Sequence, residues 1–211
     1  MKYELILFDL DGTLVDSASG VIKSIDYTLK NLNLGMINDE IKKSFIGPPI
    51  YNSLKNTFNL SDKEAKKATE IFRNIYKEKF LYEAQVYDDI PRLLQTLKGY
   101  NHQLAIATYK RQDYAELILK YFHLDTYFDF IKGADFESKL NKKDIIRLCL
   151  EKFNANDAVM IGDTTHDEKG AKELNIDFIS VSWGYGFKKG EADVNHALEI
   201  LKKVKVISER I

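Results

Sequence analysis

Short apolar runs alternate with helical patterns along most of this chain. The runs lie at residues 4–8 (ELILF), 103–108 (QLAIAT), 127–131 (YFDFI), 158–161 (AVMI) and 178–181 (FISV). Apolar runs of this length, bounded by polar turn residues, are typical of buried strands. The segments between them carry apolar residues at helical spacing, at 89–98, 113–122 and 143–153. This alternation predicts an α/β fold with a mostly parallel, doubly wound (Rossmann-like) sheet and helices on both faces.

The segment from residue 16 to residue 85 interrupts the alternation. It has helical periodicity and little strand pattern, and one helix face is formed by Val21, Ile25, Leu29 and Leu32. Gly35 follows as the expected end of that helix, and Ser61 with Glu64 forms a capping box that predicts the start of another. We therefore expect an all-helical insertion at 16–85 within a sheet domain made of residues 1–15 and 86–211.

Composition excludes several classes of protein. The 211 residues include 31 Lys and Arg against 32 Asp and Glu, a net charge of −1, so no global positive field favours nucleic acid as a partner. A single cysteine, Cys149, cannot form an internal disulfide or a cysteine-based zinc site. No apolar run approaches the roughly 20 residues of a membrane span, and no secretory signal pattern is present. We expect a cytoplasmic protein without a membrane partner.

Two aspartates follow the first expected strand. Asp9 and Asp11 lie two residues apart, and Gly12 would allow a sharp turn that aims both carboxylates outward. Ligands of open parallel sheets bind at the carboxyl ends of the strands, so this pair is a candidate site. The alternative is a turn in which the Asp side chains bind their own backbone.

A second acidic motif follows the strand at 158–161. Asp163 and Asp167 lie four residues apart there, although Asp163 or Thr164 could also serve only as a helix N-cap. Both motifs end strands that we expect to be neighbours, and four converging carboxylates would repel one another. A hard divalent cation with oxygen ligands, most simply Mg²⁺, would relieve that repulsion.

Two further features complement the acidic motifs. Thr108 and Tyr109 follow the second core strand, where a hydroxyl and free backbone amides suit an anion; the alternative is a strand-end cap. Lys139, Lys142 and Lys143 precede a helix, and one of them would balance the negative site unless they form only a solvated charge run.

Together these motifs resemble those of the haloacid dehalogenase-like hydrolase superfamily, in its phosphoglycolate phosphatase-like subgroup with a helical cap. The resemblance covers nearly the whole chain and follows the order of the family motifs: Asp9-x-Asp11-Gly12-Thr13, Thr108, a lysine, and Gly162-Asp163-x-x-x-Asp167. It implies a Rossmann-like catalytic core at 1–15 and 86–211 and a cap at 16–85. Lys142 matches the family lysine better than Lys139.

The resemblance also implies a mechanism. Asp9 would be the nucleophile that forms an aspartyl-phosphate, and Asp11 would protonate the leaving oxygen and then activate water. Mg²⁺ would be held by the carboxylates of Asp9 and Asp163 and the backbone carbonyl of Asp11. Asp167 would either bind the ion as well or orient the residues that bind it.

The same resemblance assigns the phosphate-binding residues. Thr108, the Tyr109 amide, Gly12 and Lys142 would contact the phosphoryl oxygens. Tyr109 departs from the Asn or Ser of many relatives, which bears on pocket size.

The expected substrate is a small phosphorylated metabolite, with phosphoglycolate phosphatase-like hydrolysis as the first expectation. A 5'-nucleotidase or pyrophosphatase is the second, followed by a β-phosphoglucomutase-like mutase or a non-catalytic binding protein on the same fold. Asp11 argues against a dehalogenase, which needs no protonated leaving oxygen. The insertion has no histidine, unlike the cap of the mutase relatives. Residues 183–186 (WGYG) resemble a loop of the same subgroup that either lies near the site or only packs Trp183.

Overall fold

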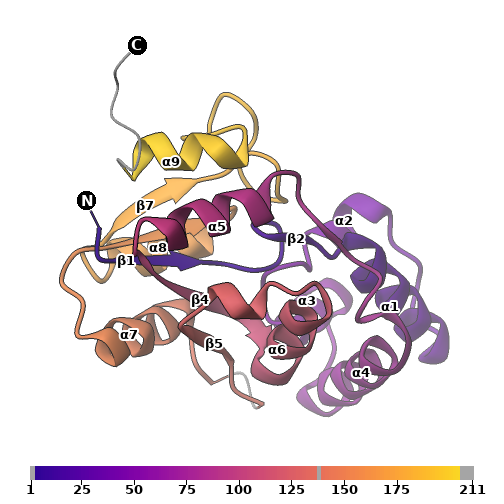
Figure 1. Cartoon of the computed structure of the whole chain (residues 1–211). Coiled ribbons are helices and arrows are strands. Elements are labelled where there is room, and N and C mark those ends of the chain that lie inside the picture. Colours follow the sequence, from indigo (N-terminus) through magenta and orange to yellow (C-terminus); the bar gives the residue numbers. More distant parts are fainter. Residues whose placement is uncertain (1–2, 137–138, 205–211) are drawn as a thin grey trace. The chain divides into compact units, whose positions relative to one another are not determined.

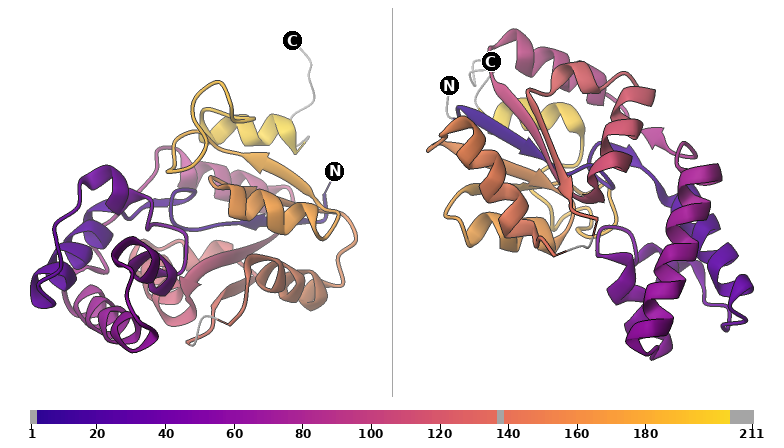
Figure 2. Two further views of the ribbon diagram at one scale, coloured as in Figure 1. Left: turned by 180° about the vertical axis from the view of Figure 1, so that it is seen from behind. Right: turned by 90° about the horizontal axis from the view of Figure 1, so that it is seen from below.

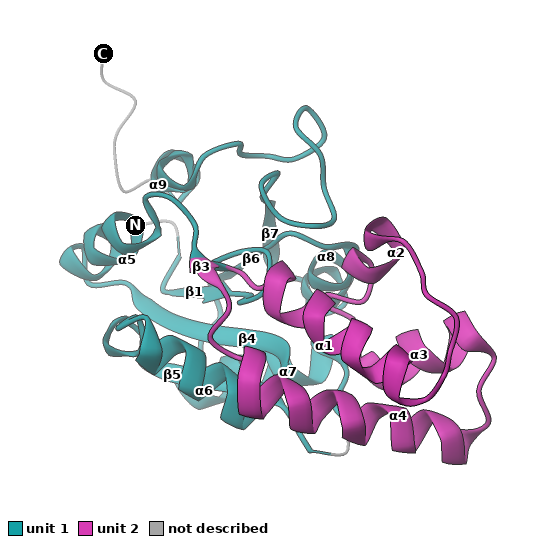
Figure 3. Ribbon diagram, turned by 90° about the vertical axis from the view of Figure 1, so that its right-hand side faces the viewer, with its two compact units in different colours: residues 1–15, 86–211 teal, residues 16–85 magenta. Residues whose placement is uncertain are grey.

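The computed structural model describes residues 3–136 and 139–204 (Figure 1). The chain divides into two compact units (Figure 3). One is discontinuous and consists of Met1–Val15 and Val86–Ile211, and the other is Asp16–Gln85. No helix among the described residues is both long enough and apolar enough to cross a membrane.

The larger unit is built on a five-stranded sheet in the order β5-β4-β1-β6-β7. The strands are β1 (Leu5–Phe8), β4 (Gln103–Arg111), β5 (Phe130–Ala134), β6 (Ala158–Gly162) and β7 (Asp177–Ser180). All four pairings between neighbours are parallel. The predicted α/β fold with a parallel, doubly wound sheet is therefore confirmed.

Strand order reverses at β1, the central strand. The chain proceeds from β1 to β4 and β5 on one side and then to β6 and β7 on the other. The register aligns Phe8, the last residue of β1, with Ile106 of β4 and Ile161 of β6. The carboxyl ends of β1 and β6 thus meet at the point where ligands of such sheets bind.

Helices lie on both faces of this sheet (Figure 2). Leu5 and Leu7 of β1 belong to a buried cluster with Ile146 and Cys149 of α7 (Lys142–Phe153) and Ala171 of α8 (Thr165–Lys172). The other side chains of β1 are also fully buried and, by strand alternation, face the opposite side. The remaining helices of this unit are α5 (Ile90–Gly99), α6 (Gln112–Tyr121), α9 (Ile200–Lys203) and the 3₁₀ turns η2 (Asp125–Tyr127) and η3 (Ala197–Glu199).

The smaller unit is helical. Its elements are α1 (Ala18–Asn31), α2 (Asp39–Lys43), α3 (Ile50–Phe58), α4 (Asp62–Ile75) and the π-helical turn η1 (Tyr76–Phe80). Short strands β2 (Val15–Asp16) and β3 (Gln85–Val86) pair where the chain enters and leaves this unit. The Ser61 hydroxyl accepts from the Glu64 amide and the Glu64 carboxylate accepts from the Ser61 amide, so the capping box is confirmed.

Asparagine, rather than glycine, adopts the left-handed conformation after several helices, and this corrects the expectation for Gly35. After α1 the left-handed residue is Asn33, with φ 52°, not Gly35. Gly99 lies within α5, and Asn101 adopts the left-handed conformation at φ 61°. Asn tolerates this conformation because its short polar side chain can bind the local backbone.

The strand expected at 127–131 is displaced in the structure. Tyr127 ends the 3₁₀ turn η2, and β5 runs from Phe130 to Ala134. The carboxylate of Asp129 accepts a hydrogen bond from the Leu104 amide, so a side chain takes the place of a backbone partner just before the strand begins. The apolar residues Tyr127 and Phe128 therefore precede the ladder rather than join it.

Candidate active site

Three aspartates from the two acidic motifs converge at the carboxyl edge of the sheet. Asp9 follows β1, Asp163 follows β6, and Asp167 lies in the first turn of α8. Each contributes an oxygen atom, and these three atoms lie within 4.8 Å of one another. All three residues are buried, with at most 4% of their surface exposed. The neighbouring positions of β1 and β6 thus bring together residues that are more than 150 positions apart in sequence.

Asp163 is held by the turn after β1 and by the loop after β7. Its carboxylate accepts hydrogen bonds from the Thr13 hydroxyl at 3.3 Å and the Tyr185 amide at 2.7 Å. Gly12 has φ +85°, and a Cβ there would lie 2.2 Å from an Asp163 oxygen; a Cβ at Gly184 would lie 2.4 Å from the same atom. Residues 183–186 therefore form one wall of the site, and glycine is required at two of its closest approaches.

Asp167 has two roles. One carboxylate oxygen accepts from the amide and hydroxyl of Thr164, which is the N-cap of α8. The other oxygen lies 2.6 Å from the Nζ of Lys142. The N-cap alternative thus applies to Thr164 and not to Asp163, and the cap itself fixes the orientation of Asp167.

Lys142 is the lysine that the structure places in the acidic cluster. It is the first residue of α7, its side chain is 4% exposed, and its Nζ donates to Asp9 at 2.7 Å as well as pairing with Asp167. Its amide donates to the Tyr109 hydroxyl at 2.9 Å. Lys139 precedes the helix, and its amide donates to the carboxylate of Asp135. Proximity to Asp9 favours Lys142 over Lys139.

Thr108 and Tyr109 lie on the part of β4 that extends beyond its neighbour β1. The pairing of β4 with β5 shifts register between Ala107 and Arg111, an irregularity of the kind that a β-bulge produces. Thr108 is buried, and its hydroxyl accepts from the Lys110 amide at 3.1 Å. The ring of Tyr109 packs edge to face with His166 at 5.8 Å.

Lys110 was not among the residues indicated by the sequence. Its Nζ lies 2.9 Å from both carboxylate oxygens of Asp11, and the two side chains are only 5% and 10% exposed. Asp11 is therefore oriented toward β4, and its carboxylate is not part of the three-aspartate cluster. No local signal marked it, because the register of β4 against β5 shifts between Ala107 and Arg111, and simple strand alternation does not hold across such a shift.

Burial and mutual repulsion set the electrostatics of the cluster. Burial, followed by the charges of Asp167 and Asp11, raises the pKa of Asp9 to about 6 although Lys142 opposes the change. Burial and the charges of Asp9 and Asp167 raise the pKa of Asp163 well above its ordinary value. Burial lowers the pKa of Lys142, but Asp167 and Asp9 raise it by more, so it stays charged.

The donor set fits a hard divalent cation. One lysine does not neutralise three buried carboxylates, and the pKa values of Asp9 and Asp163 are raised first by burial and then by repulsion from the neighbouring carboxylates. The clustered side-chain atoms are all carboxylate oxygens, the ligands that Mg²⁺ prefers.

The raised pKa of Asp9 predicts that the metal-free protein loses stability as the pH rises. Its pKa is about 6 in the folded chain against an ordinary value of 3.8, so folding favours the protonated carboxyl. The associated stability is fully present below pH 3.8 and is lost as the pH rises to about 6. The difference, 6 − 3.8 = 2.2, amounts to about 3 kcal/mol at roughly 1.4 kcal/mol for each pKa unit.

The measurement compares the free energy of unfolding of the wild-type protein and Asp9→Asn in the presence of EDTA. Because Asn does not ionise, the stability difference should move in favour of the variant by about 1 kcal/mol between roughly pH 5 and pH 7.5. A difference that stays constant over this range would contradict the raised pKa.

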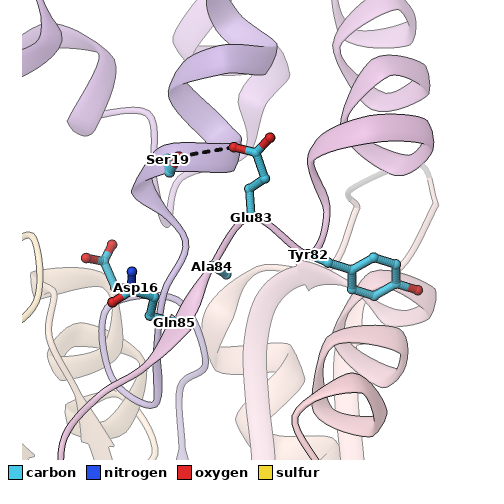
Figure 4. Close-up of a pocket in the computed structure, with 6 residues that line it drawn as sticks. All are labelled: Asp16, Ser19, Tyr82, Glu83, Ala84 and Gln85. Carbon is cyan, nitrogen blue, oxygen red and sulfur yellow. Dashed lines mark hydrogen bonds between the residues drawn. The ribbon is translucent and has the colours of Figure 1, made fainter.

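The helical unit has a pocket of its own, with a volume of about 290 Å³ (Figure 4). Its lining consists of Asp16, Ser19, Tyr82, Glu83, Ala84 and Gln85. The Glu83 carboxylate pairs with Lys23 and accepts from the Ser19 hydroxyl, and Asp16 accepts from the Ala18 amide. Because both acidic side chains have partners within the unit, the pocket lacks the charge deficit of the aspartate cluster.

The fold and site define a class: hydrolases with a doubly wound sheet and paired aspartates at its carboxyl edge. Residues 6–181 match the model of the haloacid dehalogenase-like hydrolase family, so the chain belongs to that family. A 5'-nucleotidase of Pseudomonas aeruginosa is 34% identical over 189 residues, which cover 88% of this chain and 86% of that protein. A phosphoglycolate phosphatase of Colwellia psychrerythraea is 32% identical over 203 residues, 91% of this chain and 88% of that protein.

A solved structure shows the same architecture. The crystal structure of a predicted phosphatase from Clostridium acetobutylicum superposes with a TM-score of 0.91 at 37% identity, covering 98% of this chain and 100% of that one. The expected superfamily, the phosphoglycolate phosphatase-like subgroup and the phosphatase class of enzyme are confirmed by these likenesses.

Proposed function

We propose that this protein is a Mg²⁺-dependent phosphatase that hydrolyses a small phosphomonoester through an aspartyl-phosphate intermediate. The observation that carries the proposal is the buried cluster of Asp9, Asp163 and Asp167, with Lys142 bound to two of its members. A merely structural cluster would gain nothing from this excess of buried negative charge, whereas a divalent cation binds to it and, together with Lys142, offsets the repulsion that a phosphate group would otherwise meet.

Asp9 is the nucleophile in this proposal. One of its carboxylate oxygens attacks phosphorus, the bond between phosphorus and the ester oxygen breaks, and the leaving oxygen takes a proton from Asp11. Water then attacks the phosphorus of the acyl phosphate and gives its proton to Asp11, which releases inorganic phosphate and restores the Asp9 carboxylate. Lys142 keeps Asp9 in place at 2.7 Å while this occurs.

The cation site uses the carboxylates of Asp9 and Asp163 and the backbone carbonyl of Asp11, with Asp167 orienting them. When bound, Mg²⁺ supplies charge that reduces the repulsion between the Asp9 carboxylate and the phosphate group. The Thr13 hydroxyl and the Tyr185 amide hold Asp163 in position for this role.

The phosphoryl oxygens are bound by neighbouring groups on the same edge. We assign them to the Thr108 hydroxyl, the Tyr109 amide, the turn at Gly12 and the Lys142 ammonium. The position of Thr108 supports this assignment, because it is buried and lies on β4 beyond Ile106, where the pairing of β4 with β1 ends.

Residues 1–15 and 86–211 form the catalytic core in this proposal, and the helical insertion 16–85 acts as a cap that selects the substrate. Phosphoglycolate phosphatase-like activity is the first candidate, supported by the relative of that name at 32% identity. 5'-Nucleotidase activity is the second, supported by the relative at 34% identity. The substrate in either case is a small phosphorylated metabolite.

Release of phosphate from p-nitrophenyl phosphate tests the proposed reaction. We expect hydrolysis with Mg²⁺, loss of activity with EDTA and recovery when Mg²⁺ is added in excess. Asp11→Asn should slow alkyl esters more than the nitrophenyl ester, because a poor leaving group needs protonation most. Activity that persists in EDTA would contradict the metal dependence, and an equal loss on all esters would contradict the acid role of Asp11.

A further inference from the structure

The roles assigned above include Asp11 but give no function to Lys110, the buried lysine paired with it. Both Asp11 oxygens lie 2.9 Å from the Lys110 Nζ, and neither side chain is more than 10% exposed. Among the described residues of the sheet unit, Lys110 and Lys142 are the buried lysines, and Lys142 already binds Asp9 and Asp167. Lys110 is therefore the second positive charge that the fold places at this edge.

The position of Lys110 follows from the ends of two neighbouring strands. Pairing of β1 with β4 ends at Phe8 and Ile106, so Asp11 and Lys110 both lie beyond the ladder. The Lys110 amide is tied to the Thr108 hydroxyl at 3.1 Å, which links the lysine to a residue assigned to the phosphate group. Lys110 therefore contacts both Thr108, through its backbone amide, and Asp11, the group proposed to contact the ester oxygen, through its ammonium.

Contact between Asp11 and the ester oxygen requires a change in this pair. Asp11 has two carboxylate oxygens, and both now accept from Lys110. When one of them turns to the ester oxygen, the ammonium loses an acceptor in a buried place, which is unfavourable unless another acceptor replaces it. The leaving group is the part of the substrate that arrives beside Asp11, so it is positioned to supply the replacement.

We propose that Lys110 is a specificity-determining residue that binds a carboxylate on the leaving group of the substrate. A substrate carboxylate is the same chemical group that the ammonium binds now, so it can supply the acceptor that Asp11 withdraws. The inference rests on the proposed function, because it takes Asp11 as the group that contacts the ester oxygen. The inference distinguishes the two candidate substrates, because the leaving group of phosphoglycolate carries a carboxylate and a nucleoside leaving group does not.

The test uses 2-phosphoglycolate and its carboxamide, two esters that differ in one charge. The wild-type kcat/KM should be at least tenfold higher for the carboxylate than for the amide, and Lys110→Met should bring this ratio close to one. Lys110→Arg should keep part of the preference because it keeps the charge. Any loss caused by a disturbed Asp11 affects both esters and cancels in the ratio. Lys172→Met, at an exposed position of α8, removes the same charge from elsewhere and should leave the ratio unchanged.

Three results would overturn the inference: no preference in the wild-type protein, a preference that Lys110→Met retains, or an equal loss of preference in Lys172→Met. If the wild-type protein hydrolyses neither ester nor p-nitrophenyl phosphate, the proposed function fails on its own. Calorimetric binding of the two esters to Asp9→Asn, with and without Lys110→Met, then decides the inference separately. A Lys110-dependent preference for the carboxylate supports it, and equal binding rejects it.

Discussion

Replacement of Asp9 by Asn should lower kcat for p-nitrophenyl phosphate by about 10⁴-fold or more, the scale on which enzymes lose activity when their nucleophile is removed. Asn has nearly the same shape as Asp, but its amide has no anionic oxygen to attack phosphorus. The fold should survive, because the change removes a buried charge whose pKa is already raised to about 6. Thermal unfolding of the variant checks this directly.

The matched control for Asp9→Asn is Asp157→Asn. Asp157 is an exposed aspartate immediately before β6, at the amino edge of the same sheet, opposite the edge that carries Asp9. Its loss changes the net charge equally and should leave kcat unchanged. A comparable fall in both variants would assign the effect to the overall charge of the protein.

Acid quenching of the wild-type reaction gives a second, independent readout for Asp9. Mass spectrometry should find one phosphoryl group on the peptide that contains Asp9, and none on that peptide from Asp9→Asn. Phosphate found on another peptide, or an Asp9→Asn protein that retains more than a tenth of the activity, would reject Asp9 as the nucleophile.

Local patterns were sufficient for the sheet and for most of the acidic edge. The apolar runs at 4–8 and 158–161 predicted β1 and β6, and the parallel topology then brought Asp9 and Asp163 to one edge. Asp167 could also be expected there, because it lies four residues after Asp163, in the first turn of the helix that follows β6. The proximity of these aspartates could be predicted because parallel strands place their carboxyl ends at the same edge of the sheet, whatever the individual side-chain contacts are.

Features that depend on one local distortion were not predictable. Lys110 contacts Asp11 from the part of β4 where the register against β5 shifts, yet the residues from Thr108 to Arg111 contain no glycine or proline to mark that shift. Helix ends at Asn33 and Asn101 were missed for a related reason, since glycine is the usual signal for a left-handed residue. In each case the deciding quantity is a backbone angle that several residue types can adopt.

Replacement of Lys142 by Met should have the largest effect on stability. Its ammonium lies 2.7 Å from Asp9 and 2.6 Å from Asp167, and removal of one partner from a buried ion pair costs about 3–5 kcal/mol. We expect the free energy of unfolding in EDTA near neutral pH to fall by about 3 kcal/mol. The loss should shrink at lower pH, where the carboxylates take up protons. The kcat should also fall by about 10²–10³-fold, because a charged group beside the phosphate is lost.

Lys143→Met is a stringent control for Lys142→Met, because it removes the same side chain from the adjacent position of α7. Lys143 is 38% exposed and lies 3.6 Å from Glu173, so its loss should cost no more than about 1 kcal/mol. Excess Mg²⁺ should recover part of the stability lost in Lys142→Met, since a cation among Asp9, Asp163 and Asp167 replaces the missing charge, and should add nothing specific to Lys143→Met. Equal losses in the two variants, or a Lys142→Met deficit that Mg²⁺ does not reduce, would mean that the three carboxylates do not act together as a cation site.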